Sequence, residues 1–274
     1  MILTLTTDFG LEDVYVGVMK GVITQINPHL NIIDLTHQIP PQHITAGRFC
    51  LMNAVPYFPR NTVHVAVVDP GVGSERKGCA IAFARGYLVG PDNGLLSGVL
   101  SRFPAQKAVT LTNPQYWRSD RVSRRLRRNQ IPAPATTVGQ TFHGRDIFAP
   151  VGAHLASGVP LEALGDPIPL DQLTPDTFPR PKMTAEQILG SIQYIDYFGN
   201  LITNIPGAAV EGKEWSVTVN QQTIPRGNTY SSYPPQQLLA LIGSHGWVEI
   251  AMNQGNAAAT LSLSYGSAIA LLIR

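Results

Sequence analysis

The sequence has few cysteines and no cysteine pattern that would hold a metal. Only Cys50 and Cys79 occur among 274 residues, and both stand in apolar surroundings. Their spacing matches neither a zinc knuckle nor a redox pair. This argues against a disulfide framework and a zinc site, and we expect two reduced packing residues in a reducing cytosol.

Long apolar runs and an excess of one charge are absent as well. No apolar stretch approaches the roughly 18 residues that a membrane-spanning helix needs. The formal net charge is only +2. The N-terminus lacks the basic region, apolar stretch and small-residue cleavage site of a signal peptide. We therefore expect a cytoplasmic protein with no membrane role.

What is present in the first 158 residues is an alternation of short apolar runs and segments with helical periodicity. This order is typical of β–α units on a largely parallel sheet. Strands are predicted over 2–5, 31–35 and 63–68, and helices over 14–26 and 44–55. The third of these strands is apolar except for His64, which suits burial on both faces.

A change near residue 159 indicates a second domain. Six prolines fall between residues 159 and 181, with the weak periodicity of a linker that wraps over a surface. Short β-type stretches follow at 188–195, 215–219, 247–252 and 268–273. The sequence therefore predicts an N-terminal α/β domain over 1–181, including the linker, and a smaller C-terminal antiparallel β-barrel-like domain over 182–274.

Polar residues after predicted strands are the first candidates for a site, because open α/β sheets bind ligands beyond the carboxyl ends of their strands. The first strand leads into TTDFGLED (6–13). A carboxylate placed like Asp8 suits the two hydroxyls of a ribose, and it also suits a turn. Asp13 has two interpretations, a ligand contact or the N-cap of the following helix.

The strand predicted over 63–68 leads into DPGVGSER (69–76). Its proline and glycines favour a tight turn that projects Asp69 outward and leaves Arg76 within reach of it. The two form either a structural ion pair or part of a reactive site. A phosphate loop is not predicted, because no Gly-Lys-Ser/Thr ending follows.

The run TFHGRDIFAP (141–150) places His143 at the start of a predicted helix that extends to about residue 157. A histidine in this place is a cap, a packing residue or a catalyst, and Gly144 beside it leaves space for a ligand. We expect local roles for its neighbours. The carboxylate of Asp146 interacts favourably with the dipole of the predicted helix, and Arg145 forms a local ion pair.

Two further runs lie in the second predicted domain. DYFGNLITN (196–204) is either an ordinary tight turn or an adenine site, in which Phe198 stacks on the base and Asn200 hydrogen-bonds its edge. SHGWVEIAMNQGNAA (244–258) alternates like a strand with polar ends.

Together and in this order, the five runs resemble the S-adenosyl-L-methionine hydroxide adenosyltransferases, relatives of the fluorinases and chlorinases that use the same substrate. The resemblance covers nearly the whole chain. It implies an N-terminal α/β domain, a C-terminal β-barrel-like domain, and hydrolysis of S-adenosyl-L-methionine to adenosine and L-methionine. It also implies a homotrimer that holds the substrate between neighbouring subunits.

The resemblance implies roles for individual residues. Asp69, Arg76 and His143 form the set that activates water. The resemblance also implies that Asp8 and Asp13 hold the ribose or the methionine end, and that Phe198 and Asn200 hold the adenine. Ser244 is implied to contact the methionine end or the base. Glu249 and Tyr230 are implied to support the site. The halogenases are implied to have a tyrosine in place of Asp69, whose carboxylate would repel a halide and so favours water.

The implied chemistry needs a nucleophile and no general acid, because the sulfonium departs as a neutral thioether. We expect His143 with Asp69 to take the proton of the water, and Arg76 to supply a positive field. No metal and no redox cofactor is expected.

Three alternative functions stay open. A chlorinase-like halogenase shares the motifs. A calcium-dependent nucleoside N-ribohydrolase also begins with an acidic strand end, but it needs more carboxylates than Asp8 and Asp13 to hold the metal. A non-catalytic sensor of adenosine or S-adenosyl-L-methionine would bind without turnover.

One basic segment lies outside the resemblance. Six arginines stand close together, at positions 118, 121, 124, 125, 127 and 128. Such a run can bind nucleic-acid phosphates. Because no aromatic residues are interleaved after Trp117, we expect a solvated helix or loop and no nucleic-acid partner.

Overall fold

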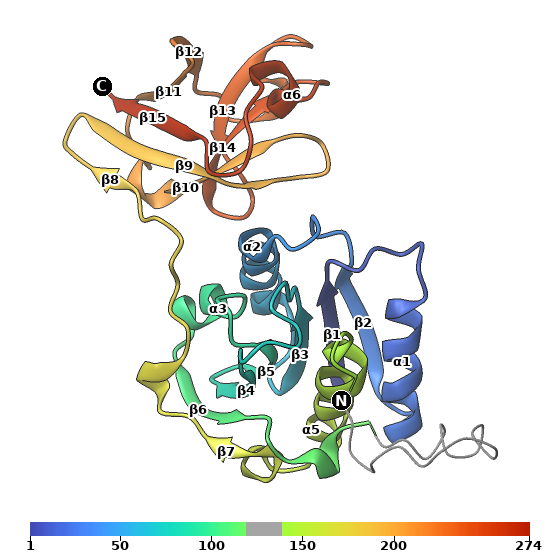
Figure 1. Cartoon of the computed structure of the whole chain (residues 1–274). Coiled ribbons are helices and arrows are strands. Elements are labelled where there is room, and N and C mark those ends of the chain that lie inside the picture. The colour runs from blue at the N-terminus through green and yellow to red at the C-terminus, as the bar shows by residue number, and fades with distance from the viewer. Residues whose placement is uncertain (119–138) are drawn as a thin grey trace. The chain divides into compact units, whose positions relative to one another are not determined.

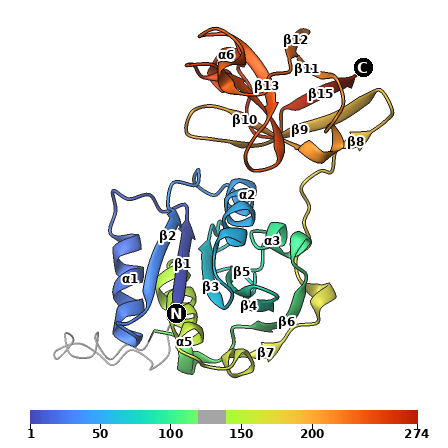
Figure 2. The same ribbon diagram turned by 180° about the vertical axis from the view of Figure 1, so that it is seen from behind.

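The chain divides into two compact units, Met1–Asp176 and Thr177–Arg274 (Figures 1 and 2). The computed structural model describes residues 1–118 and 139–274. Each unit buries its own apolar cluster. The first is an α/β unit and the second an antiparallel β unit, so the predicted fold class is confirmed.

The first unit is built on a seven-stranded sheet with the order β2-β1-β3-β5-β4-β6-β7. Its strands are β1 Ile2–Thr7, β2 Asn31–Thr36, β3 Thr62–Val67, β4 Gly78–Phe83, β5 Gly86–Pro91, β6 Ala105–Thr110 and β7 Asp166–Pro167. The pairs within β2-β1-β3-β5 are parallel, whereas the pairs that involve β4, β6 and β7 are antiparallel. The sheet is therefore mixed and not largely parallel as predicted. The connection between β4 and β5 is far too short for the crossover that a parallel pair needs.

Two pairs of helices cover the sheet of the first unit. α1 Tyr15–Ile26 contacts α5 Ala149–Ala156, and α2 Ile44–Ala54 contacts α3 Ser97–Arg102. Glycines let the helices approach the chain of β3 closely: a Cβ on Gly152 of α5 would meet Val65, and one on Gly47 of α2 would meet Val68. Val65 and Val68 are an odd number of residues apart, and side chains at such positions point to opposite faces of a sheet. The two helix pairs therefore lie on opposite sides of the sheet (Figure 1).

The proline-rich segment contributes to the packing of the first unit. Leu161, Leu164, Ile168 and Leu173 are buried, and β7 pairs with β6 at the edge of the sheet. Pro167 has no N–H to donate, which suits a short strand in an edge position.

The second unit is an antiparallel sheet with the order β12-β11-β15-β9-β10-β14-β13, and β8 pairs with β9. The strands are β8 Lys182–Met183, β9 Gln187–Ile195, β10 Leu201–Pro206, β11 Trp215–Val219, β12 Gln222–Pro225, β13 Leu238–Ile242, β14 Trp247–Met252 and β15 Ala268–Ile273. A bridge between Arg226 and Ala240 joins the two ends of this order, so the barrel is nearly closed. The short helix α6, Ala257–Leu261, packs against β14.

None of the helices in residues 1–118 and 139–274 combines the length and apolar character of a membrane span.

The close packing of α5 on β3 predicts opposite effects for two glycine substitutions. A Cβ at Gly152 would lie 2.4 Å from Cγ2 of Val65, whereas a Cβ at Gly21 in α1 would meet nothing within 4 Å. We expect Gly152→Ala to lower the free energy of unfolding by about 1–3 kcal/mol through overpacking. Gly21→Ala should raise it by about 0.5–1 kcal/mol, because alanine favours the helix. Urea unfolding of both variants measures the difference, and a Gly152→Ala protein as stable as the wild type would contradict this packing.

Candidate active site

The turn after β3 projects Asp69 at the carboxyl end of the sheet. The N–H of Val72 donates to the carbonyl of Asp69 across 3.2 Å and closes the turn. Gly73 has a φ of +79°, and a Cβ there would lie 2.7 Å from the carbonyl oxygen of Gln140. Only glycine therefore allows this turn to adopt its shape and to lie so close to the segment that carries His143.

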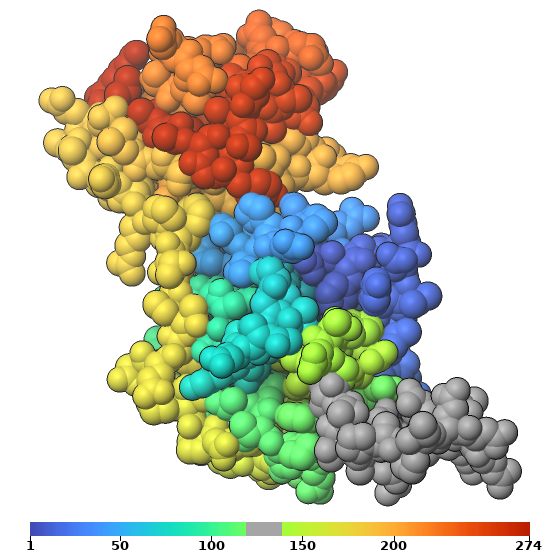
Figure 3. All heavy atoms as spheres, in the orientation of Figure 1, coloured from blue at the N-terminus to red at the C-terminus, as the bar shows by residue number. Residues whose placement is uncertain are grey.

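Arg76 links the other two predicted catalytic residues, Asp69 and His143. Its Nε donates to Oδ1 of Asp69 across 2.8 Å, and its Nη2 donates to Oδ2 of the same carboxylate. Nη2 also contacts Nδ1 of His143 across 2.7 Å, and the guanidinium lies 5.3 Å from the ring centre of the buried Phe148. The surface view shows the turn after β3 (cyan) directly beside the segment that begins α5 (lime) (Figure 3).

The contact with Arg76 fixes the tautomer of His143. A guanidinium can only donate hydrogen bonds, so Nδ1 of His143 must accept. Neutral His143 then carries its proton on Nε2. Burial lowers the pKa of His143, and the positive charge of Arg76 lowers it further, although the carboxylates of Asp69 and Asp146 act in the opposite direction. While Arg76 occupies Nδ1, His143 has no free lone pair with which to take a proton from water.

His143 stands at the start of a π-helical turn, η3 Gly144–Phe148, that continues into α5. The N–H of Ala149 donates to the carbonyl of Gly144, five residues back. Pro150 has no N–H to offer the carbonyl of Asp146, which instead accepts from the backbone N–H of Arg118 across 2.9 Å. The sequence thus explains the irregular turn, a feature that is frequent at functional sites.

A buried carboxylate anchors this turn. Asp146 is 3% exposed and accepts hydrogen bonds from Arg118, Arg145 and the N–H of Gly139. Burial alone would raise the pKa of Asp146, but hydrogen bonds and charges from Arg145 and Arg118 hold it below its usual range. Arg145 thus pairs locally, as predicted. Of the basic run, Arg118 has this structural role, and the other five arginines lie outside the described residues.

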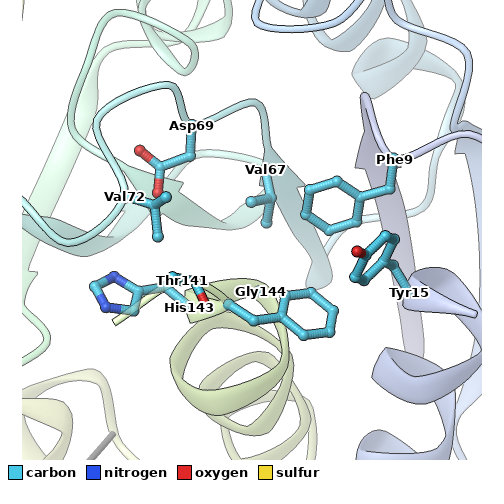
Figure 4. A pocket seen from close by; sticks show the side chains of 9 residues that line it. Phe9, Tyr15, Val67, Asp69, Val72, Thr141, His143 and Gly144 are labelled. Carbon is cyan, nitrogen blue, oxygen red and sulfur yellow. The ribbon is translucent and has the colours of Figure 1, made fainter. Parts of the chain in front are cut away.

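A pocket of about 170 Å³ opens between the carboxyl ends of β1 and β3 and the start of α5 (Figure 4). Asp69 and His143 lie on one side of it and the rings of Phe9 and Tyr15 on the other. Its full lining is Phe9, Tyr15, Val67, Asp69, Val72, Thr141, Phe142, His143 and Gly144. The pocket therefore places a charged, hydrogen-bonding edge opposite an aromatic wall.

The acidic residues after β1 differ from each other. Asp8 follows β1, the parallel neighbour of β3, and accepts the N–H of Gln42 across 2.7 Å. Burial raises the pKa of Asp8, and the charge of Asp69 raises it further, against the hydrogen bond from Gln42. Asp13 is exposed, and α1 begins after Val14 with no side-chain cap. The capping role considered for Asp13 is therefore wrong.

The second unit has a pocket of about 460 Å³ lined by Asp196, Phe198, Asn200, Tyr230, Met252, Gln254 and Gly255. The side chain of Phe198 is 70% exposed, whereas Asn200 is only 6% exposed. Both predicted adenine contacts thus line one pocket, together with Tyr230. Asp196 was not among the predicted residues, although it begins the run that supplied the other two.

Glu249 supports this pocket from within the barrel. It is 2% exposed, and its carboxylate accepts Tyr230 Oη across 2.6 Å and lies 2.8 Å from Nε2 of His245. Nδ1 of His245 accepts the N–H of Trp247, so Nε2 is the protonated nitrogen that donates to Glu249. Sequence reasoning missed His245, whose only signal is its position four residues before Glu249. Ser244 is exposed in the turn between β13 and β14.

Within residues 1–118 and 139–274, no three His, Cys, Asp or Glu side chains are grouped so that they could hold a metal ion. Cys50 and Cys79 are both free thiols.

The fold and the two pockets define a two-domain protein, in which an α/β unit carries a charged pocket at its strand ends and a β-barrel-like unit carries an aromatic and polar one. The N-terminal domain model of the SAM hydroxide adenosyltransferases matches residues 3–165, and the C-terminal domain model matches residues 190–270. This chain belongs to the SAM hydroxide adenosyltransferase family.

Named relatives support this assignment. The chain is 38% identical to an (R)-S-adenosyl-L-methionine hydrolase from Thermus thermophilus, over 97% of each chain. A protein of the same name from Salinispora tropica is 37% identical over 96% of this chain and 95% of its own. A fluorinase from Actinoplanes sp. is more distant, 28% identical over 74% of this chain and 71% of its own. The crystal structure of an uncharacterized conserved protein from Thermotoga maritima matches with a TM-score of 0.84 and 34% identity, over 99% of both chains.

The geometry around Arg76 predicts the protonation of His143. Nitrogen-15 NMR should show a neutral imidazole protonated on Nε2, with a pKa below the usual 6.5. In Arg76→Met the cation is lost while Asp69 remains, so this pKa should rise. Lys20→Met removes a cation that pairs with Asp34, and it should leave the titration of His143 unchanged. A wild-type His143 protonated on Nδ1 at neutral pH would rule out the proposed contact.

Proposed function

We propose that this protein hydrolyses S-adenosyl-L-methionine to adenosine and L-methionine by attack of a water oxygen on C5′ of the ribose. The observation that carries the proposal is the Asp69, Arg76 and His143 cluster in a pocket at the strand ends. Family membership supports the substrate, and the names of the relatives support hydrolysis as the reaction.

The reaction exchanges one bond at carbon for another. As the water oxygen bonds to C5′, the bond from C5′ to sulfur breaks, and its electron pair stays on sulfur as a neutral thioether. The attacking water becomes a protonated alcohol, a far stronger acid than a carboxylic acid. A carboxylate is therefore a sufficient base late in the reaction, even though it is weak toward free water.

We assign the base role to Asp69 and a positioning role to His143. Each carboxylate oxygen of Asp69 keeps a lone pair after accepting from Arg76, so it can still accept from the water. Nε2–H of His143 can donate to the same water and hold its remaining lone pair toward carbon. Arg76 fixes both groups by donating to the Asp69 carboxylate and to Nδ1 of His143. This division follows from the tautomer of His143, and it replaces the expectation that His143 takes part in removing the proton.

The second pocket supplies the recognition part of the proposal. Phe198 and Asn200 bind the adenine, with Tyr230 and Glu249 in support, whereas Asp8 and Asp13 hold the ribose or the methionine end, and Ser244 the methionine end or the base. We further propose a cytoplasmic homotrimer in which each substrate contacts two neighbouring subunits, as the family resemblance implies. The proposed reaction uses no metal or redox cofactor.

Heavy-oxygen water tests the reaction directly. With purified protein and S-adenosyl-L-methionine in labelled water, mass spectrometry should find the label in the 5′-hydroxyl of adenosine and none in methionine. Parallel reactions contain excess chloride or a chelator, neither of which should change the products.

Each alternative function gives a different result in this experiment. Chloroadenosine would indicate a halogenase, and free adenine lost on chelation would indicate a metal-dependent nucleoside N-ribohydrolase. Binding without any product would indicate a sensor. Unlabelled adenosine would mean that water is not the nucleophile.

Substitutions at the cluster test the assigned roles. Asp69→Asn removes the base, and it should lower kcat by roughly two to four orders of magnitude while substrate binding survives. His143→Gln retains an acceptor for Arg76 and a donor for the water, so it should lose less than Asp69→Asn. Asp171→Asn, an exposed acidic position of the same unit, is the control. If Asp69→Asn kept a near-normal kcat, the assignment of the base would be wrong.

A further inference from the structure

Both carboxylate oxygens of Asp196 accept hydrogen bonds within the turn that contains Asn200. Its Oδ1 accepts the backbone N–H of Phe198 across 2.9 Å and that of Asn200 across 2.8 Å. Its Oδ2 lies 2.9 Å from Nδ2 of Asn200. Both oxygens are thus committed to holding the loop between β9 and β10, which forms one edge of the second pocket.

The carboxylate leaves the Asn200 amide only one favourable orientation. If the amide were turned over, its Oδ1 would face Oδ2 of Asp196, and two acceptors would meet in a largely buried place. Among the described residues, no hydrogen bond uses Oδ1 of Asn200. That oxygen is therefore available to a ligand in the pocket, beside the second hydrogen of Nδ2.

Tyr230 adds a second group with a fixed direction. Its hydroxyl hydrogen is donated to Glu249 across 2.6 Å, so its oxygen can only accept from the pocket. An asparagine amide with a free oxygen and a free N–H matches an adenine edge, where the 6-amino group donates and a ring nitrogen accepts. A 6-oxo purine presents an acceptor in place of that donor, and it meets the Asn200 oxygen unfavourably.

We propose that Asp196 is a positioning residue that locks the Asn200 amide and thereby makes the second pocket specific for purines with a 6-amino group. This inference rests on the proposed function, which places the adenine of the substrate in this pocket. It predicts that the enzyme rejects the inosine analogue of its substrate, because adapting to a 6-oxo group would require the amide rotation that Asp196 opposes.

Binding of three nucleosides to the full-length wild-type protein tests the lock without any substitution. The probes are adenosine, purine riboside, which has no group at position 6, and inosine. Calorimetry should give adenosine the lowest Kd, purine riboside an intermediate one, and inosine the highest, with adenosine and inosine separated by on the order of 10- to 100-fold. Equal affinities for adenosine and inosine would overturn the proposal.

The substitution Asp196→Asn tests the role of the carboxylate itself. The Oδ1 of the new asparagine can still accept the two backbone N–H groups, so its Nδ2 must face Asn200. The Asn200 amide should then turn over and offer its N–H groups to the pocket. We expect the preference for adenosine over inosine to fall at least tenfold or to reverse, with little change in the thermal midpoint of unfolding. Glu211→Gln, an exposed carboxylate of the same unit, should keep the wild-type preference.

The outcomes separate this inference from the proposed function. Unchanged discrimination in a folded Asp196→Asn protein would overturn the role of Asp196 while leaving hydrolysis of S-adenosyl-L-methionine intact. If the wild type hydrolysed that substrate but bound none of the three nucleosides, the lock would again be wrong and the reaction would stand. Absence of both hydrolysis and nucleoside binding would overturn the proposed function as well.

Discussion

The site in the first unit depends on one guanidinium. Arg76 forms a bidentate pair with Asp69, donates to His143 and lies over Phe148. These partners come from the turn after β3 and from the segment that begins α5, which are far apart in sequence. Two largely buried charges are costly unless they are paired and hydrogen-bonded. The same contacts that satisfy Arg76 also orient the carboxylate and select the imidazole tautomer.

The need to pair buried charges also distinguishes the two carboxylates at the strand ends. Asp8 and Asp69 follow neighbouring parallel strands, so their charges repel each other. Arg76 neutralises only Asp69, and Asp8 has backbone N–H groups in place of a cation. Two chemically identical side chains at one sheet edge thus have different partners, an arginine for Asp69 and a backbone N–H for Asp8. In the second unit, Asp196 and Glu249 are also held by hydrogen bonds, and there the result is orientation of the amide and hydroxyl groups that line the pocket.

Much of this arrangement was predictable from the sequence, because local patterns encode it. The apolar run over 63–68 gave a strand buried on both faces, and the glycines after it indicated the turn that brings Arg76 to Asp69. The antiparallel half of the sheet was missed, because its cause is the short connection between β4 and β5 and not the composition of either strand. Individual hydrogen-bond partners at the two pockets also escaped prediction. Local sequence patterns do not determine the tautomer of His143 or the hydrogen bond from His245 to Glu249.

The turn between Asp69 and Arg76 also bears on how such a protein can change during evolution. Arg76 must reach back seven positions to Asp69 while still reaching across to His143, and Gly73 must lie against the backbone of Gln140. An inserted or deleted residue would break these contacts together, even if every functional side chain were retained. These contacts therefore constrain the length of this loop as well as its side chains, so we expect tolerated changes at the site to be substitutions.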